Sequence, residues 1–226
     1  DDGDDTAAID PALESFETGY AGRTAPALLD DQLDGQTVIV LTTPGAGAAD
    51  VSGIVDAVEE AGGEIVGQGE LTAKLLDPAG RQFAEGVAQQ VGEDVEGIDT
   101  TGDSYQRIGA ALARALVADE TADVDGDATA LRSAFVEGDL LTLDGEPEAR
   151  ASLAVVVTGP RSSTSQDQGV GLAGITSAMD DASAGVLVAG PVSASRPGGF
   201  VAAMRNDDQT ATISTVDVSD SPSGRI

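Results

Sequence analysis

Two apolar runs of six residues constrain the fold of this chain more than any other feature of its sequence. Thr37–Thr42 and Leu153–Thr158 are rich in β-branched residues, and a turn that contains Pro and Gly follows each of them. A continuous apolar run of this length is typical of a strand that is buried on both faces. Such strands occur in parallel sheets covered by helices on both sides, so the sequence predicts an α/β fold.

The segment after the first run predicts a complete strand–helix–strand unit. Asp50–Ala61 carries apolar residues at the spacing of one helix face, with Asp50 as the expected N-cap. Gly62 and Gly63 then end the helix, and Glu64–Leu71 predicts a second strand. Parallel strands joined in this way form a right-handed crossover.

The rest of the chain repeats this alternation. Helices are predicted over Pro78–Val91 (with Phe83, Val87 and Val91 facing the core), Tyr105–Val117, Thr129–Val136 and Gln166–Met179, and a weaker pattern over Pro11–Leu33 is interrupted by Gly19, Gly22 and Pro26. Strands are predicted at Leu140–Leu143, Gly185–Ala189 and Thr210–Val216. We therefore expect a lead-in over residues 1–31 and one Rossmann-like α/β domain over residues 32–226, with a mostly parallel sheet flanked by helices.

The charge of the chain excludes one class of partner. Its 226 residues include 40 acidic and 11 basic side chains, which give a formal charge of −29. This charge repels phosphate backbones, so we expect no nucleic-acid partner. Two interpretations of the acidity remain, namely a solvated surface suited to salt or solubility and a docking face for a basic partner or divalent cations. The acidic clusters fall in predicted tails and loops, which favours the first.

The chain has no Cys and no His. This removes zinc fingers, iron–sulfur clusters, haem ligation, Cys nucleophiles and a Ser-His-Asp triad. A general base near neutral pH would have to be a strongly shifted carboxylate, Lys74 or a Tyr, so we predict no enzymatic activity, no catalytic residues and no cofactor. Copper prefers sulfur or imidazole ligands. Only Met179 and Met204 supply sulfur, and we expect both to fill the core, so no metal site is assigned.

Two loops resemble known binding motifs but depart from them at decisive positions. Gly45–Asp50 nearly matches the dinucleotide fingerprint, but Asp50 stands where the third glycine belongs, and its carboxylate would repel a pyrophosphate. Asp123–Asp127 begins like an EF-hand loop, but Ala128 and Ala134 replace the required Gly and Glu. We interpret the first loop as an ordinary strand-to-helix turn, and the second leaves only weak calcium binding open.

The loop after the second apolar run is the candidate binding site. Arg161, Ser162, Ser163 and Thr164 stand directly before a predicted helix. A guanidinium, hydroxyls and the free amides of a helix N-terminus can bind a small anion or the carboxylate of a partner. The loop lacks the Gly-Lys-Ser/Thr ending of a P-loop, so nucleotide hydrolysis is not indicated. A capped polar loop without a ligand is the alternative.

Several segments, in their order and spacing, resemble a known family. They are Leu33–Val40, Leu71–Thr72, Leu76–Pro78, Ala154–Gly159, Gln168–Val170, Leu187–Gly190, Ser195–Pro197, Ile213–Asp217 and Pro222–Ile226. Together they resemble the actinobacterial copper-transport-protein-B family, the MctB/SteB type, over residues 32–226. The C-terminal stretches are the most specific part of this resemblance.

The resemblance implies an envelope protein with a short cytoplasmic N-terminus, one transmembrane helix, a coiled coil and this domain outside the cytoplasmic membrane. The membrane anchor would then precede this chain, and residues 1–31 would be a remnant of the coiled coil or follow it. Family members continue beyond Ile226 with an apolar run, so a C-terminal element of the family would be missing here. The coiled coil implies a homodimer, and a cytoplasmic partner would be reached through the N-terminus.

Two functions attach to the family. One is copper export or resistance in the mycobacterial outer envelope. The other, for corynebacterial members, is coordination of cell division with control of a peptidoglycan hydrolase. The missing Cys and His favour the second, as does the poor channel that one membrane helix per chain would make. We therefore expect a non-catalytic, dimeric binding and assembly module whose extracytoplasmic partner is a cell-wall hydrolase, with copper handling as the alternative.

Overall fold

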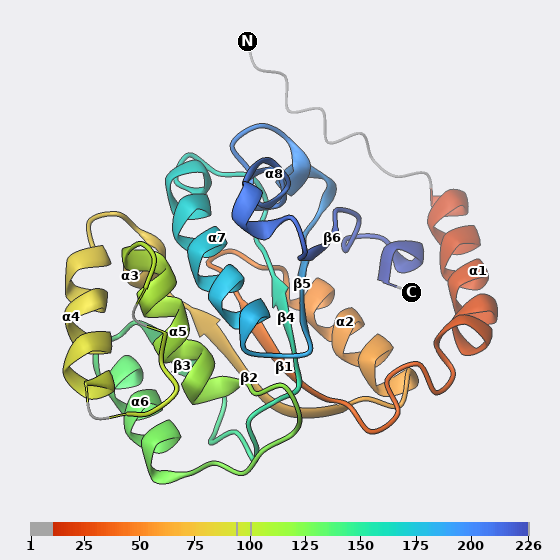
Figure 1. Cartoon of the computed structure of the whole chain (residues 1–226). Helices are drawn as coiled ribbons and strands as arrows, with labels where there is room; N and C mark the ends of the chain where they lie inside the picture. The colour runs from red at the N-terminus through yellow and green to blue at the C-terminus, as the bar shows by residue number, and fades with distance from the viewer. Residues whose placement is uncertain (1–10, 94, 100, 226) are drawn as a thin grey trace.

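The computed structural model describes residues 11–93, 95–99 and 101–225, and it places helices on both faces of a six-stranded sheet (Figure 1). The strands are β1 Thr37–Thr42, β2 Glu64–Leu71, β3 Leu141–Leu143, β4 Leu153–Val157, β5 Gly185–Ala189 and β6 Ser214–Val216. Their order is β3-β2-β1-β4-β5-β6, and only the pairing of β2 with β3 is antiparallel. The parallel strands follow the 2-1-3-4-5 order of one doubly wound fold. The predicted α/β class with a mostly parallel sheet is confirmed.

The helices divide unequally between the two faces. They are α1 Pro11–Leu29, α2 Ala48–Glu60, α3 Ala73–Leu76, α4 Arg81–Gly92, α5 Ser104–Leu116, α6 Gly126–Glu137, α7 Ser165–Asp181 and α8 Phe200–Asn206, with 3₁₀ turns η1 Val192–Ser195, η2 Asp208–Thr210 and η3 Pro222–Arg225. One face, which we call the thin face, is covered by α2, with α1 and η3 packed beside it. Helices α3 to α8 cover the other, the thick face (Figure 1).

Side chains of the central strands alternate between the hydrophobic clusters on the two faces of the sheet. In β1, Val38 and Val40 point to the thin face, and Ile39 and Leu41 point to the thick face. Successive side chains of a strand point to opposite sides, so a strand that is buried on both sides must be apolar at every position. This explains why the runs read from the sequence are continuous.

The thick face contains most of the core and one buried cation. Phe135 of α6 is fully buried there. Arg132 of the same helix is also buried, and its guanidinium donates to the carbonyls of Ala115 (2.8 Å), Pro147 (3.2 Å) and Ala149 (3.2 Å). Burial lowers the pKa of Arg132 from its ordinary value. Arg132 thus ties the end of α5 to the segment that leads into β4.

The structure corrects two details of the predicted elements. Helix α2 begins at Ala48 with Gly47 as its N-cap, so Asp50 lies in the first turn and is not the cap. Phe83 is 49% exposed, and α4 buries Ala84 and Ala88 in its place. The ring of Phe83 lies under the Lys74 ammonium instead, 4.3 Å from ring centroid to nitrogen.

Two boundaries also differ. Helix α1 continues through Gly19, Gly22 and Pro26, and the hydroxyl of Thr24 donates to the carbonyl of Tyr20 in the turn before the proline. The strand predicted from Thr210 forms only at Ser214–Val216, because the residues before it turn in η2. Residues 1–10 of the predicted lead-in lie outside the described residues.

Candidate functional site

The carboxyl ends of β1 and β4 mark the point where the strand order reverses, which is the usual ligand crevice of a doubly wound sheet. Here the two loops that leave these strands pack on each other. The amide of Gly159 donates to Thr43 Oγ1 (3.1 Å). A Cβ at Gly159 would lie 2.6 Å from the carbonyl oxygen of Pro44. Backbone atoms therefore fill the place where a nucleotide phosphate lies in related folds.

The loop that nearly matches the dinucleotide fingerprint is covered by the C-terminal turn. Arg225 Nη2 lies 3.4 Å from Asp50 Oδ1, and Arg225 Nε donates to the carbonyl of Ser219 (2.6 Å). The guanidinium crosses Gly53, where a Cβ would lie 2.6 Å from Nη1. Burial raises the pKa of Asp50 although Arg225 opposes the change. This pair joins η3 to α2, and we call it the C-terminal clamp.

The hydroxyls of the predicted anion-binding loop are engaged within the protein. The amide of Ser162 donates to Ser165 Oγ (3.0 Å), and the amide of Ser165 donates to Ser162 Oγ (3.2 Å). Ser162 Oγ also lies 3.2 Å from Thr164 Oγ1, and Ser165 Oγ donates to the carbonyl of Gly198 (2.6 Å). Ser163 is exposed. The serines therefore fix the start of α7.

Arg161 is the charged residue of that loop. Its side chain is exposed and forms no ion pair within the described ranges. It borders a hollow of about 380 Å³ together with Gln166, Gly198 and Asn206. Sequence reasoning missed Gln166 and Asn206, because only the folded loops bring α7 and α8 together. An exposed guanidinium contributes little binding energy alone, because water screens its charge.

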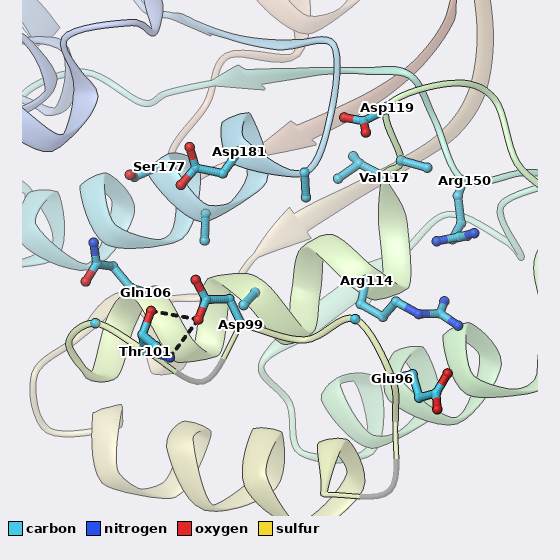
Figure 2. A pocket seen from close by; sticks show the side chains of 16 residues that line it. Glu96, Asp99, Thr101, Gln106, Arg114, Val117, Asp119, Arg150, Ser177 and Asp181 are labelled. Atoms are coloured by element: carbon cyan, nitrogen blue, oxygen red, sulfur yellow. Dashed lines mark hydrogen bonds between the residues drawn. The ribbon is translucent and has the colours of Figure 1, made fainter.

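A larger cleft lies at the opposite end of the central strands, between α5 and α7 (Figure 2). Its volume is about 560 Å³. Arg114 of α5, Asp181 of α7 and Arg150, which comes just before β4, are among its lining residues. Sequence patterns did not predict it, because its walls come from segments far apart in the chain.

The loop that begins like an EF-hand serves as a helix cap. Asp125 accepts from the amide of Ala128 (2.8 Å) and pairs with Arg114 Nη2 (2.7 Å), and Asp127 lies 3.5 Å from the same nitrogen. The hydrogen bond from Arg114 is the main cause that lowers the pKa of Asp125 to about 2. In the described part of the chain, no three acidic side chains gather closely enough to hold a metal ion.

The two methionines lie in the core of the thick face, as predicted. Met179 of α7 and Met204 of α8 are at most 1% exposed. Thr176 Oγ1, one turn before Met179, is 3.9 Å from Met204 Sδ. Both thioethers are thus closed off from solvent.

Helix α1 presents an apolar face away from the domain. Ala21 and Ala25 are buried on its inner side, which contacts α2 and η3. On the outer side, Phe16 is 69% exposed and Tyr20 53%. Leu28 is also exposed, at 58%, but it lies closer to the side of Ala21 around the helix. The rings of Phe16 and Tyr20 stack with their centroids 6.4 Å apart. No helix within the described ranges is both long and apolar enough to cross a bilayer.

Comparison with known proteins points to one family. The profile of the family described as "Copper transport outer membrane protein, MctB" matches residues 7–226. Relatives named "Copper transporter MctB" occur in Mycobacterium bovis and in two strains of Mycobacterium tuberculosis. Each is 28% identical over 235 residues, which covers 95% of this chain and 70% of the relative.

Proposed function

The chain belongs to the family of copper transport outer membrane proteins of the MctB type, and from that premise we propose that it acts as a non-catalytic, dimeric assembly module outside the cytoplasmic membrane. Its partner in this proposal is a cell-wall hydrolase whose activity is coordinated with cell division. The exposed apolar face of α1 carries the proposal, because a helix fixed on one side and apolar on the other is suited to pairing with a second helix.

A second copy of this chain is the proposed occupant of that face. Phe16, Tyr20 and Ala27 recur at intervals of four and seven residues, which fits a heptad seam with Arg23 at the remaining position. Charge supports the same choice. The helix carries two glutamates and one arginine, whereas the whole chain has a net charge of −29. Two copies of so acidic a molecule repel each other least where they meet along α1.

The oligomeric state tests this step. In analytical ultracentrifugation, we expect a dimer for the wild type and a monomer for Phe16→Glu combined with Tyr20→Glu. Val170→Glu is the matched control, because Val170 is also an exposed apolar residue on a helix, 62% accessible on α7. It should leave the dimer intact. A wild type that is monomeric, or a double variant that stays dimeric, would contradict the pairing through α1.

The hydrolase partner needs a separate experiment. Purified envelope peptidoglycan hydrolases are assayed on isolated cell walls with and without the chain. We expect the wild type to change the rate of cell-wall release, and we expect the monomeric double variant to lose that effect. No change in rate for any hydrolase that is present in the same envelope would count against the proposed partner.

Copper handling is the second candidate, and the names of the family and of its relatives favour it. The chain offers no imidazole or thiolate, and its two thioethers are buried. Anaerobic titration with Cu(I) and aerobic titration with Cu(II), both followed by calorimetry, separate the two candidates. We expect no stoichiometric binding. A one-to-one isotherm that Met179→Leu with Met204→Leu abolishes would favour copper instead.

A further inference from the structure

The cleft between α5 and α7 has the size of a small-ligand site. Its volume of about 560 Å³ lies within the range of roughly 300–1,000 Å³ that such sites occupy. Ala110 of α5 and Ala178 and Ala182 at the end of α7 line it with small side chains, which keeps the space open. It lies beside the amino ends of β4 and β5, since Arg150 and Ala182 line it just before these strands, and no residue of the C-terminal clamp or of α1 lines it.

One end of the cleft carries two arginines with unused donors (Figure 2). Arg114 pairs with Asp125 through Nη2, but its Nη1 is buried and has no hydrogen-bond partner. The guanidinium of Arg150 donates through Nε to the carbonyl of Asp123 (3.3 Å), and no carboxylate within the described ranges lies within 4.0 Å of it. Glu96 and Asp119 also line the cleft near these arginines (Figure 2), but neither forms an ion pair with them in the described part of the chain, so the free donors still indicate a place for an anionic group.

Asp181 supplies negative charge away from these arginines (Figure 2). It lies in the last turn of α7, where the helix dipole already places negative partial charge and where no basic residue compensates it. Its carboxylate forms no hydrogen bond or ion pair with the residues that the structure describes. Asp99, which also lines the cleft, accepts from the amide and the hydroxyl of Thr101 (2.8 and 2.7 Å). This part of the cleft favours a cation.

We propose that the α5–α7 cleft binds a short amphoteric ligand, an amino acid or small peptide, with its carboxylate at Arg114 and Arg150 and its ammonium at Asp181. Such a ligand supplies the missing partner at both ends, because each of its charges meets a protein charge of opposite sign. Its net charge is zero, so the field of the acidic protein does not repel it as it would repel a simple anion. This site is independent of the dimerisation proposed for α1.

A series of ω-amino carboxylic acids, from 3-aminopropanoic to 8-aminooctanoic acid, tests both the chemistry and the spacing. Binding to the full chain is measured by calorimetry and by NMR shifts of the amides of Ala178 and Ala182. We expect one chain length to bind at least tenfold more tightly than the carboxylic acid or the amine of equal length. Equal affinity for the amino acid and its carboxylic acid, or no dependence on length, would overturn the proposal.

Substitutions at the two ends of the cleft test which end binds the carboxylate of the ligand and which binds its ammonium group. Arg150→Gln and Asp181→Asn should each weaken binding of the preferred amino acid about tenfold. Arg150→Gln should leave the weak amine binding unchanged, and Asp181→Asn should leave the weak carboxylate binding unchanged. Arg205→Gln is the control, since Arg205 of α8 pairs with Asp217 after β6 and does not line the cleft, and it should bind like the wild type. Circular dichroism shows which variants are folded. Unchanged affinity in both folded variants would overturn the site.

Discussion

The two faces of the sheet bury hydrophobic clusters of different size. The thick face buries a continuous cluster supplied by helices α3 to α8, with Phe135 and Phe200 among its largest members. The thin face buries a small cluster in which Ile54 and Val58 of α2 meet Val38 and Val40 of β1. The remaining cover of the thin face is η3, held by the C-terminal clamp, and α1 (Figure 1). Stability is therefore concentrated on one side, and the surface available for assembly on the other.

Topology explains this division. The chain moves from β1 to β2 in one direction across the sheet, and from β4 to β5 and β6 in the other. Right-handed crossovers in opposite directions place their helices on opposite faces. The first crossover contains only α2, whereas α7 and α8 belong to the second group and α3 to α6 to the long connection from β2 back to β4. With α2 alone supplied by a crossover, Leu153, Leu187 and Val216 on the thin face remain partly buried. A module that must attach to other chains can do so on this face without opening its main core.

The largest effect is expected from a cavity in the thick face. Phe135→Ala removes a side chain with 0% exposure and should lower the free energy of unfolding by about 3–5 kcal/mol. Val136→Ala is the control, since this neighbour is 40% exposed, and it should cost less than about 0.5 kcal/mol. Urea denaturation measures both. Similar losses for the two variants would contradict the difference in burial along α6.

The same experiment on the thin face should give a smaller loss. Ile54→Ala truncates a side chain of α2 that is 6% exposed at the edge of the small cluster. We expect about 2 kcal/mol, the low end for Ile→Ala, because partly buried neighbours can move into the space. Val55→Ala, one position along, should cost under about 1 kcal/mol because Val55 is only partly buried. A loss for Ile54→Ala as large as that for Phe135→Ala would remove the distinction between the faces.

The comparison also shows what the sequence can predict. Strands β1, β2 and β5 begin and end at the predicted residues. In β1 and β5 a continuous apolar run between turn residues leaves little choice, and β2 is bounded by the glycines that end α2. Phe83 was placed wrongly because its spacing fits a helix face that Ala84 and Ala88 occupy. Periodicity shows that α4 has an apolar face, but it does not show which of its residues point into the core. The side of α4 that packs against α5 and α6 is the one that carries the buried alanines.

The candidate sites were less predictable for a related reason. The loop at Arg161–Thr164 was found because a strand and a helix flank it in sequence. The cleft at Arg114 and Arg150, and the pairing of Asp50 with Arg225, join segments that lie far apart in the chain. No local pattern encodes such contacts. For these sites the sequence only excludes a ligand, because the carboxylate of Asp50 would repel a phosphate at the start of α2.

Lowering the pH should affect the stability of the two faces differently, because each face carries one aspartate with a shifted pKa. The Arg114 guanidinium holds the pKa of Asp125, at the start of α6 on the thick face, at about 2, below the ordinary value of 3.8. Ionised Asp125 therefore adds stability that is fully present above about pH 4 and is lost as the pH falls through about 2. Burial raises the pKa of Asp50 on the thin face, so its contribution has the opposite sign.

Asp125→Ala should cost about 1 kcal/mol near neutral pH, the usual value for an N-cap. Asp125→Asn retains a capping side chain and loses the charge, so it isolates the ion pair. Its cost should be about 0.5 kcal/mol, because Asp125 is 46% exposed and solvent screens the pair. Unfolding free energies at pH 6 and pH 3 measure this. If the difference between wild type and Asp125→Asn is as large at pH 3 as at pH 6, the ion pair does not set that slope.

The smallest effect concerns the C-terminal clamp, and a double-mutant cycle is needed to detect it. Gly53→Ala should stabilise helix α2 by up to about 1 kcal/mol through helix propensity alone. In the wild type its Cβ would lie within 2.8 Å of Arg225 Nε, so it must displace the side chain that holds η3. We therefore expect Gly53→Ala to change the wild type by less than about 0.5 kcal/mol, the propensity gain being offset by the loss of the clamp.

In the Arg225→Ala background the clamp is already absent, and Gly53→Ala should then show its full gain of about 1 kcal/mol. The coupling between the two positions, measured by urea denaturation, is the quantity of interest. An equal effect of Gly53→Ala in both backgrounds would mean that Arg225 does not hold η3 against α2. A coupling of the expected sign would establish that the partly buried Arg225 helps to attach the C-terminal turn to the thin face. That turn would then be released at small energetic cost, which the deep cluster of the thick face does not permit.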